Sequence, residues 1–501
     1  MTGDQSYERF DSEQQESCVS KCTARKASKN TLLISFCILV GTGTLFSAIY
    51  TFVLASSTVH VGQIIHMSDF HLDAYYDSRL SVKCRCHWKP SNPTCNNPLN
   101  STARSGKRGS YGCDSPVSLV KSAVEAAYAV SKKAKAILPV VVSGDYTRHA
   151  THDYIDPSML VKNAFANVTT WMKNAGFKEV VGTWGNDDFA ENYYFDLSKS
   201  CQQQSLIAST SQEMKRLLPN LDSATTHSTN TINPTSMRCS GYYAYNLQET
   251  GIRILSLNTI LYSVKHQPDY SDENFQDPEG QFAWMEEQLQ DCLVDSSCRA
   301  VWILGHIAPG REYCMQSPSW KDIYVEKYLD ILISWSPKNL IKAQLFGHEH
   351  INSIRLLSAE HTDLPPILLT AAVSPVYLNR PAFRVLDYDR DIRSSNFGHI
   401  LDFTVFGMTG FTASDEWETR FTASDEFKLN NISSTSVLAW INSFTTAPMN
   451  QPFETFVKRS WDRDTIPPTG YSCPFIFPDI CHLLYVREVD IEICTKKRSR
   501  S

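Results

Sequence analysis

The sequence carries little net charge of either sign. Its 47 lysine and arginine residues nearly balance 53 aspartate and glutamate residues, which leaves a formal net charge of −6. There is no overall basic field of the kind that binds a nucleic-acid backbone, so we expect no nucleic-acid partner. With 42% hydrophobic and 20% charged residues, the composition is that of a folded protein rather than a disordered one. A chain of 501 residues can bury a substantial core and form two or three domains.

Residues 31–55 contain no charged side chain. This mostly apolar run is long enough to cross the roughly 30 Å hydrocarbon core of a bilayer. It is longer than the apolar region of about 7 to 15 residues in a cleaved signal peptide, so we predict an uncleaved transmembrane signal-anchor; a buried helix of a soluble domain is the alternative. Four basic residues precede the run and place the N-terminus in the cytoplasm: Lys21, Arg25, Lys26 and Lys29. We therefore expect a single-pass type II membrane protein with a disordered cytoplasmic tail (1–30) and a lumenal or extracellular remainder.

The cysteines and glycosylation sequons fit this topology. Three of the 15 cysteines precede or lie within the apolar run, and the twelve that follow it are an even number. We expect these twelve to form disulfides, whose pairing the sequence leaves open. Cys84-Arg85-Cys86-His87 could also be a zinc site, but disulfides are favoured in an oxidising lumen. Three Asn-X-Ser/Thr sequons, which predict a glycoprotein, all lie downstream of the run, at Asn100, Asn167 and Asn431.

Five short motifs rich in histidine and carboxylate follow one another along the chain. Most of them stand at the end of a β-rich apolar run: Asp69-Phe70-His71, Gly144-Asp145, Gly185-Asn186-Asp187-Asp188, Gly305-His306 and Gly347-His348-Glu349-His350. Predicted strands alternate with predicted helices, which indicates an α/β architecture. In such proteins, functional groups stand at the C-terminal ends of the strands.

The remaining segments define the expected domains. We predict a catalytic domain over residues 60–400 and a mostly helical C-terminal subdomain with a basic tail over 401–501. Residues 198–233 are rich in Ser, Thr, Gln and Asn and predict an insertion or elaborated loop. The six residues that start at Phe411 recur from Phe421, which we interpret as a local duplication, since two copies are too few for a solenoid.

Histidine and carboxylate ligands together suggest the chemistry of these motifs. Two cations roughly 3.5–4 Å apart can share a hydroxide and neutralise phosphoryl oxygens during hydrolysis of a phosphoester. Mixed imidazole and carboxylate ligands suit zinc, manganese or iron, whereas a purely oxygen shell would favour magnesium or calcium. Asp145 is the candidate for the carboxylate that bridges two metals.

The order of the five motifs resembles that of the calcineurin-like metallophosphoesterases. Further segments are similar to the acid sphingomyelinase-like phosphodiesterases of that superfamily. The endopolyphosphatases belong to the same group. These segments begin at Tyr111 (YGCDSP), Leu257 (LNTILY), Gly305 (GHIAPG) and Arg380 (RPAFRV). The resemblance covers roughly residues 60–400 and implies a β-sandwich flanked by helices.

The resemblance also implies which residues bind metal. One of two divalent ions, most simply zinc, with manganese or iron as alternatives, would be held by Asp69, His71, Asp145 and His350. The other would be held by Asp145, Asn186, His306 and His348. His149 stands where this family has a histidine suited to protonating the leaving group. His66, His87 and His152 match no motif and are expected to be structural.

Two departures from the family pattern bear on the substrate. Asp187 occupies the position after the metal-binding asparagine, where many relatives have histidine; it could act as an acid when protonated in an acidic lumen, or orient His149. The resulting GN-(Asn/Asp)-Asp pattern resembles the vacuolar endopolyphosphatases, whereas His350 is closer to the sphingomyelinase-like branch. Too few residues separate the apolar run from Asp69 for a saposin-like lipid-presenting module, which makes sphingomyelin a weaker substrate candidate.

The sequence thus predicts a lumenal two-metal phosphoesterase of the acid sphingomyelinase-like phosphodiesterase type. It would hydrolyse phosphodiester or phosphoanhydride bonds of a small-molecule or polymer substrate by attack of a metal-bridging hydroxide. A vacuolar-type endopolyphosphatase is the alternative, and a sphingomyelinase or a catalytically silent membrane-anchored binding protein is less favoured. The expected location is the lysosome or vacuole, or the cell surface, with one N-terminal helix in the membrane.

Overall fold

The computed structural model describes residues 60–88, 95, 106–134, 136–219, 234–270, 275–446, 448–464 and 479–499. The predicted cytoplasmic tail (1–30), the predicted signal-anchor (31–55) and the sequon at Asn100 lie outside these residues. Among the residues that are described, no helix has both the length and the apolar character needed to cross a membrane.

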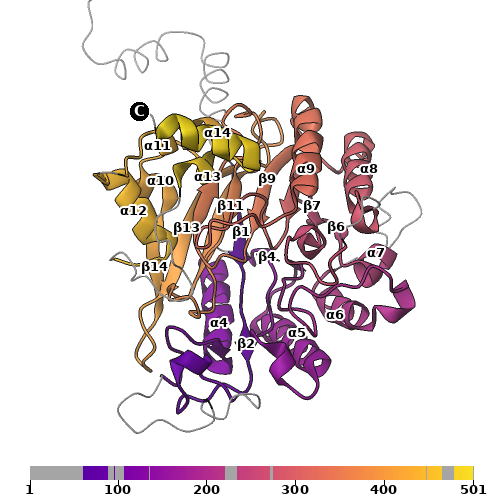
Figure 1. The fold of residues 1–501 in the computed structure, drawn as a ribbon, viewed down its shortest axis with the longest axis vertical. Helices are drawn as coiled ribbons and strands as arrows, with labels where there is room; N and C mark the ends of the chain where they lie inside the picture. Colours follow the sequence, from indigo (N-terminus) through magenta and orange to yellow (C-terminus); the bar gives the residue numbers. More distant parts are fainter. Residues whose placement is uncertain are drawn as a thin grey trace, which may run out of the picture. The chain divides into compact units, whose positions relative to one another are not determined.

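Two six-stranded mixed sheets form the centre of the fold from residue 60 onward (Figure 1). The first has the strand order β14-β13-β12-β1-β4-β5. Its strands are β1 (Val61–Met67), β4 (Val140–Val142), β5 (Val180–Gly182), β12 (Ala382–Asp389), β13 (Ile400–Met408) and β14 (Trp417–Thr422). The second has the order β10-β11-β9-β8-β7-β6. Its strands are β6 (Tyr243–Asn246), β7 (Ile252–Ser256), β8 (Ala300–Leu304), β9 (Ile341–Phe346), β10 (Ser353–Arg355) and β11 (Ile367–Leu369). A small ladder joins β2 (Leu72–Asp73) to β3 (Ser115–Pro116).

Helices connect and cover the sheets. The longer ones are α4 (Val117–Lys133), α5 (Pro157–Ala175), α6 (Ser205–Lys215), α8 (Gln281–Val294) and α9 (Asp322–Trp335). The shorter ones are α7 (Pro234–Cys239), α10 (Ala423–Phe427), α11 (Ser434–Asn442), α12 (Gln451–Ser460), α13 (Ile480–Leu484) and α14 (Glu488–Arg498). α6 packs on β5, α8 packs on β7 and β8, and α10 packs on β13 and β14. The mixed α/β architecture predicted from the sequence is therefore confirmed.

Local sequence explains where these elements begin and end. β8 is apolar along its whole length and completely buried, as expected of a parallel strand covered on both faces. α5 begins with Asp156, whose carboxylate accepts a hydrogen bond from the Met159 amide at 2.9 Å, followed by Pro157 at the first helical position. It ends at Gly176, which adopts a φ of 114° that a residue with a side chain adopts only with strain.

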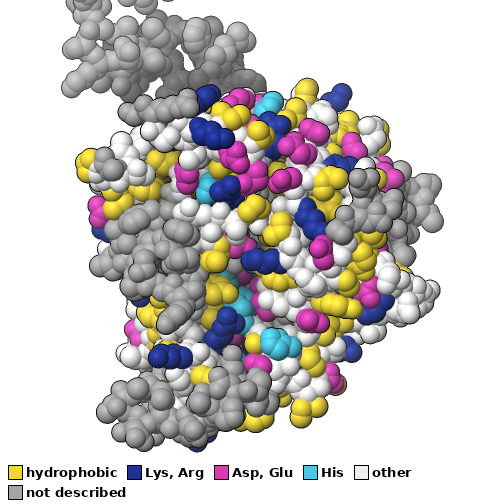
Figure 2. Space-filling view, in the orientation of Figure 1, with side chains coloured by type: hydrophobic (Ala, Val, Ile, Leu, Met, Phe, Trp, Pro, Cys, Tyr) yellow, Lys and Arg dark blue, Asp and Glu magenta, His cyan; other side chains and the backbone are white. Residues whose placement is uncertain are grey.

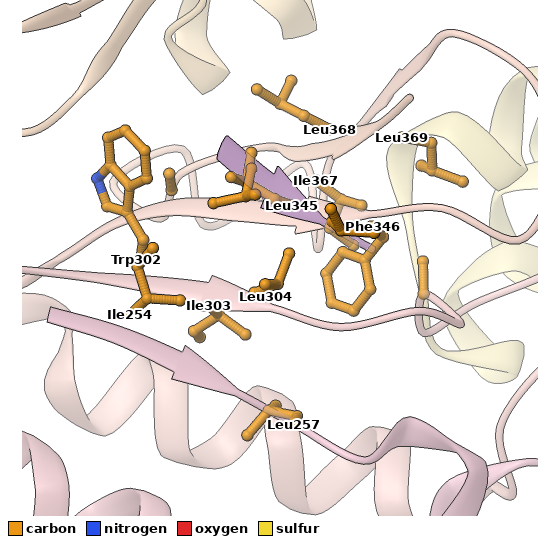
Figure 3. Close-up of a cluster of buried hydrophobic side chains, with 14 of the residues drawn as sticks. Ile254, Leu257, Trp302, Ile303, Leu304, Leu345, Phe346, Ile367, Leu368 and Leu369 are labelled. Carbon is orange, nitrogen blue, oxygen red and sulfur yellow. The ribbon is translucent and has the colours of Figure 1, made fainter. Parts of the chain in front are cut away.

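The core lies on and between the two sheets. Figure 3 shows apolar side chains of β7, β8, β9 and β11 packed together, with Trp302, Leu304 and Phe346 among them. Side-chain hydrogen bonds also join the sheets: the Tyr243 hydroxyl of β6 donates to the Gly182 carbonyl of β5 at 2.7 Å. The two sheets are thus one packed body, and the loops at their edges have a rigid base.

The parallel strands place their C-terminal ends at common edges. β1 is parallel to β4, with Ile65 opposite Val140, and β4 is parallel to β5. In the second sheet, β7, β8 and β9 are parallel as well. Each of the five histidine- and carboxylate-rich motifs begins within three residues of the end of one of the strands β1, β4, β5, β8 or β9.

Two expectations about the chain's organisation need correction. The sheet continues past residue 400, the expected end of the catalytic domain, because β13 hydrogen-bonds along β12 and β14 along β13. The C-terminal helices follow only after these strands and gather beside them (Figure 1, yellow). The predicted loop over 198–233 contains α6, because buried Ile207 and Met214 anchor this helix on the sheet despite its polar composition.

The expectation of disulfides is confirmed. Five bridges are described: Cys84–Cys95, Cys86–Cys113, Cys201–Cys239, Cys292–Cys298 and Cys481–Cys494. Cys314 is disulfide-bonded as well. The Cys-Arg-Cys-His segment is therefore a disulfide loop, as favoured over zinc, and not a metal site.

We predict that Ile303→Ala, in the middle of β8, lowers the free energy of unfolding by about 2–5 kcal/mol, because Ile303 is fully buried and truncation leaves a cavity. Ile155→Ala is a matched control, since Ile155 is fully exposed and its truncation should cost less than about 0.5 kcal/mol. Urea unfolding of both variants checks this. Equal losses in the two variants would contradict the assignment of the core.

Candidate metal centre

The five loops that follow β1, β4, β5, β8 and β9 bring all of the predicted metal ligands together. These residues are Asp69, His71, Asp145, Asn186, His306, His348 and His350, and all are buried except His348, whose side chain is 13% exposed. They belong to both sheets and are separated by up to 281 positions in the chain, so only the fold brings them into contact. Two groups of three share Asp145: Asp69 and His71 on one side, and His306 and His348 on the other.

The backbone is strained where these ligands stand. Five of them have positive φ angles: Asp69 (52°), His71 (39°), Asp145 (55°), His348 (70°) and His350 (59°). Each left-handed residue with a side chain costs on the order of 1–3 kcal/mol and persists only where its surroundings enforce it. Such clustering of strain is typical of sites whose side chains must point in set directions.

The glycines of the motifs let the loops approach one another closely. A Cβ on Gly185 would clash with the side chain of Asp145 and lie 2.5 Å from its backbone nitrogen. A Cβ on Gly347 would clash with the Ser68 hydroxyl and lie 2.8 Å from Asp69 Oδ2. These two motifs therefore need glycine for contact between loops of different strands.

The first ligand group surrounds Asp69. His350 Nε2 lies 3.4 Å from Asp69 Oδ1, and His71 Nε2 lies 3.8 Å from the same oxygen. The Nε2 atoms of His71 and His350 face each other at 3.0 Å. His71 Nε2 is also 3.4 Å from Asp145 Oδ2, which links this group to the second one.

The second ligand group lies on the other side of Asp145. His306 Nε2 is 3.2 Å from Asp145 Oδ2 and 3.0 Å from Asn186 Oδ1. His348 contributes its imidazole to the same cluster. The Asp187 backbone amide donates a hydrogen bond to Asp145 Oδ1 at 2.9 Å, which fixes the carboxylate between the two groups.

The orientation of the imidazoles fits metal ligation. His71 Nδ1 donates to the Thr147 carbonyl at 3.0 Å, and His306 Nδ1 donates to the Ser143 carbonyl at 2.6 Å. The Nε2 lone pair of each ring is therefore directed into the centre, as in sites where a ligating histidine donates its other nitrogen to a fixed acceptor. Asp69 Oδ1 is fully buried and has no hydrogen-bond partner. A cation would satisfy this oxygen and the converging nitrogens, so the residues present fit a two-metal site.

The carboxylates create a strongly negative field at the centre. Burial alone lowers the pKa of His71, but the charges of Asp145 and Asp69 outweigh it and raise this pKa to about 10. Burial also lowers the pKa of His306, but the charge of Asp145 outweighs this effect and raises the pKa to about 9. A field that holds protons on buried imidazoles also attracts cations to them.

His149 lies beside the first ligand group. Its ring stacks on that of His71, with centroids 4.0 Å apart and planes 13° from parallel. His149 Nδ1 donates a hydrogen bond of 2.7 Å to Asp114, while its Nε2 is hydrogen-bonded to the Tyr377 hydroxyl at 2.9 Å. Nε2 is also 3.7 Å from Asp187 Oδ2. Burial and the charges of His71 and Arg85 lower the pKa of His149, and Asp114 is the carboxylate that favours its protonated form.

Three other histidines occupy the positions expected of structural residues. His66 lies under the site, with Nε2 2.6 Å from the Ser143 hydroxyl and Nδ1 accepting a hydrogen bond from Arg384 at 3.0 Å. His87 is buried and accepts a hydrogen bond of 2.9 Å from Arg148. His152 is exposed on the surface.

A pocket of about 500 Å³ opens onto the centre. Figure 2 shows histidine side chains (cyan) in a hollow of this face with lysine and arginine side chains (dark blue) beside it. Both predicted catalytic residues, His149 and Asp187, line the pocket. It is also lined by residues that the sequence analysis did not single out: Arg85, Asn192, Tyr193, Lys265, Glu312 and Tyr377.

These additional residues carry no motif, because they come from loops outside the five strand ends. Asp114, which contacts His149 behind the pocket, is different, since it lies in the YGCDSP segment that supports the family resemblance. Its buried contact with His149 now gives that segment a role. Tyr377 could not be found in this way, because only the fold places it against His149.

We predict that Gly185→Ala abolishes metal binding at Asp145, because the new Cβ collides with this carboxylate and with its backbone. Gly280→Ala is the control: no atom lies within 4 Å of the added Cβ, although the φ of 66° at Gly280 adds a backbone strain that Gly185 does not have. Metal content per chain, measured on both purified proteins, tests the prediction. Wild-type metal content in Gly185→Ala would show that the close contact of these loops is not required.

Comparison with known proteins shows which proteins this chain is similar to. No protein-family model matches the chain. It is similar to cyclic GMP-AMP phosphodiesterase SMPDL3A of Mus musculus, with 23% identity over 452 residues, which cover 87% of this chain and 92% of the relative. It is similar to acid sphingomyelinase-like phosphodiesterase 3b of Mus musculus, with 25% identity over 66% of this chain and 68% of the relative. Identity to sphingomyelinase phosphodiesterase D of Dictyostelium discoideum is 35%, over 31% of this chain and 34% of that protein.

Two solved structures are also similar, with low TM-scores. They are a putative 5′-nucleotidase from Staphylococcus aureus (TM-score 0.33, 12% identity, 72% of this chain) and the NAD nucleotidase of Haemophilus influenzae (TM-score 0.31, 13% identity, 77% of this chain). The chain spans a little over half of their lengths, 54% and 56%. The sequence relatives confirm the predicted enzyme class, a phosphoric ester hydrolase. The chain is a homologue of the acid sphingomyelinase-like phosphodiesterases, as its motifs predict.

Proposed function

We propose that this protein is a lumenal, membrane-anchored phosphodiesterase that uses two divalent metal ions, most simply zinc. The convergence of seven imidazole, amide and carboxylate ligands from five strand ends, with Asp145 at their centre, carries the proposal. When bound, the two metal ions would supply a hydroxide nucleophile and neutralise the phosphoryl oxygens. Asp69, His71 and His350 would hold one ion, and Asn186, His306 and His348 the other, with Asp145 shared.

His149 is proposed to protonate the leaving group. Its Nδ1 is held by Asp114, so that Nε2 faces the pocket that receives the substrate. During hydrolysis, a new bond forms between phosphorus and the attacking oxygen, while the bond between phosphorus and the leaving oxygen breaks. The proton on Nε2 passes to that leaving oxygen. Tyr377 hydrogen-bonds to the same nitrogen and steadies the ring.

Asp187 is proposed to position its neighbours rather than to bind metal. Its Oδ2 accepts a hydrogen bond from the Asn186 side-chain amide at 3.0 Å and lies 3.7 Å from His149 Nε2. The bond from Asn186 leaves the Asn186 carbonyl oxygen facing His306 and the second ligand group. Asp187 thereby connects a metal ligand with the proton donor.

The relatives and the pocket bear on the substrate. The relatives include phosphodiesterases for cyclic GMP-AMP and sphingomyelinase-like enzymes. Two aromatic residues, Tyr193 and Tyr377, and two cations, Arg85 and Lys265, line the pocket here. Rings that can stack on a base and cations that can bind phosphate favour a nucleotide-like or polyphosphate substrate over a lipid. Because of the cations, an endopolyphosphatase is the second candidate.

The lumenal location is proposed from the sequence together with the disulfides. Five described bridges suit an oxidising compartment, either the lysosome or vacuole or the cell surface. Asn431 is an exposed sequon asparagine, which suits a glycoprotein. Asn167 is a poorer candidate, because it lies within α5 and the hydroxyl of Thr169 donates to the Phe165 carbonyl at 2.8 Å.

We expect Asp145→Asn to lose both metal ions and to lower kcat/KM on bis(p-nitrophenyl) phosphate by at least about 10² to 10³-fold, because one ligand of each ion is weakened. Asp425→Asn, which removes an exposed carboxylate, is the control. Activity and metal content of full-length protein in detergent are the measurements. Undiminished hydrolysis in Asp145→Asn would exclude the shared-metal mechanism.

We expect His149→Gln to slow substrates with poor leaving groups by about 10²- to 10⁴-fold, and those with good leaving groups much less. Phenyl and p-nitrophenyl esters of thymidine 5′-phosphate form the matched pair, because p-nitrophenolate leaves without a proton. His152→Gln, at an exposed histidine of the neighbouring turn, serves as control. Equal losses on the two esters would mean that His149 does not donate the proton.

A substrate panel separates the two candidate functions. Wild-type protein is assayed with and without chelator on bis(p-nitrophenyl) phosphate, ATP, sphingomyelin and long-chain polyphosphate. Chelator-sensitive cleavage of the diester or nucleotide that spares polyphosphate is the result we expect. Shortening of polyphosphate with little diesterase activity would assign the protein to the endopolyphosphatases instead. No activity and no bound metal would leave a silent binding protein.

A further inference from the structure

Arg85 lines the pocket, yet its guanidinium makes no hydrogen bond or ion pair with any residue that the structure describes. The side chain is half-buried, so its charge is only partly solvated. The other cation of the pocket is different: Lys265 Nζ lies 2.7 Å from Glu312 Oε1, a paired contact. A partly buried guanidinium with unused donors inside a phosphoesterase pocket needs an anion to complete its surroundings.

The backbone fixes the position of this arginine. Arg85 stands between Cys84 and Cys86, which are bridged to Cys95 and Cys113. It ends the short helix η1 (Val82–Cys84) in a left-handed conformation with φ 55°, and its amide donates to the Val82 carbonyl. Two disulfides and a strained turn thus hold the backbone of Arg85 beside the pocket. Such an arrangement is costly for a side chain that merely faces solvent.

Arg85 is on the His149 side of the pocket. The groups that interact with its charge are Asp114, Tyr377, Asp187 and Asp153, and the first two of these hydrogen-bond to His149. Burial alone lowers the pKa of Arg85, but these neighbours raise it, so the guanidinium stays charged. Glu312 instead lies beside His348, a member of the second ligand group, and Lys265 pairs with Glu312. In the proposed mechanism the leaving group departs toward His149, which puts Arg85 on the leaving-group side of the pocket.

We propose that Arg85 forms a second anion site, which binds a phosphate carried by the leaving group. Its planar fork of donors can hold two phosphate oxygens at once. The preferred substrates would then be phosphodiesters and phosphoanhydrides whose leaving group is itself phosphorylated, such as nucleoside polyphosphates or phosphorylated dinucleotides. This inference rests on the proposed function, because it takes His149 as the proton donor. Arg85 changes no bond of the reaction; it adds binding energy on the side where the bond to phosphorus breaks.

Direct binding tests the site without relying on turnover. The affinity of the full-length, metal-loaded protein is measured by calorimetry for adenosine monophosphate and for its α,β-methylene diphosphate analogue, which cannot be hydrolysed at that bond. We expect the wild type to prefer the diphosphate analogue by at least about tenfold, the contribution of one charge-assisted phosphate contact. In Arg85→Gln, this preference should fall to about twofold or less, and Arg85→Lys should retain part of it.

Lys83→Gln is the matched control, because it removes one positive charge from the same disulfide-held loop at an exposed position. It should keep the wild-type preference. The proposal is overturned if the wild type does not prefer the diphosphate analogue, if Arg85→Gln keeps the preference, or if Lys83→Gln loses it as well. Thermal unfolding of Arg85→Gln verifies its fold, and Arg85→Lys provides the measurement should that variant not fold.

Failure of the proposed function gives a different result. It would appear as the absence of chelator-sensitive hydrolysis of bis(p-nitrophenyl) phosphate by the wild type. The binding preference and its dependence on Arg85 are measured separately from that reaction. A preference that depends on Arg85 in an inactive protein would therefore retain the anion site while discarding the phosphodiesterase.

Discussion

The arrangement of this site depends on one electrostatic constraint: buried carboxylates and imidazole lone pairs converge on a volume that only cations can satisfy. Asp145 is the centre of it, within 3.4 Å of His71 and within 3.2 Å of His306. Burying such groups without a positive charge is expensive, because few hydrogen-bond donors reach them: Asp145 Oδ1 accepts a hydrogen bond from the Asp187 amide, but other oxygens of the cluster are left without one. Asp69 Oδ1 shows the same need for a cation, because it is buried and has no hydrogen-bond partner. The desolvation of these residues therefore supports a two-metal site as strongly as the five sequence motifs do.

The rest of the fold can be understood as the support for this charged centre. Of the strands that precede the motifs, β4, β5 and β8 are apolar and buried along their whole length, and their rigidity offsets the strain of five left-handed ligand residues. Glycine at positions such as 185 and 347 lets loops of different strands touch. Beyond the ligands, backbone carbonyls set the direction of each imidazole, and Asp114 does the same for His149. Disulfides then hold the outer loop that brings Arg85 to the pocket.

How far the sequence predicts this structure differs from part to part. That the seven candidate ligands lie together could be predicted, because each follows an apolar strand in the chain and parallel strands end at a common edge. Asp114, Tyr377 and Arg85 could not be assigned roles, since they reach the site from loops without periodic patterns or motifs. The strands β13 and β14 were missed because tertiary pairing decides them: β13 pairs with β12, and β14, despite its largely polar sequence, pairs with β13. Helix α6 escaped prediction for a related reason: tertiary contacts of Ile207 and Met214 decide it, not intrinsic propensity.

The most direct test of the central claim is to locate the metal ions. X-ray diffraction from crystals of the full-length protein, recorded above and below the absorption edge of the bound metal, reveals their positions and identity. The account predicts two anomalous peaks roughly 3.5–4 Å apart, with Asp145 in contact with both. One peak close to a single ligand group, or none at these residues, would contradict it.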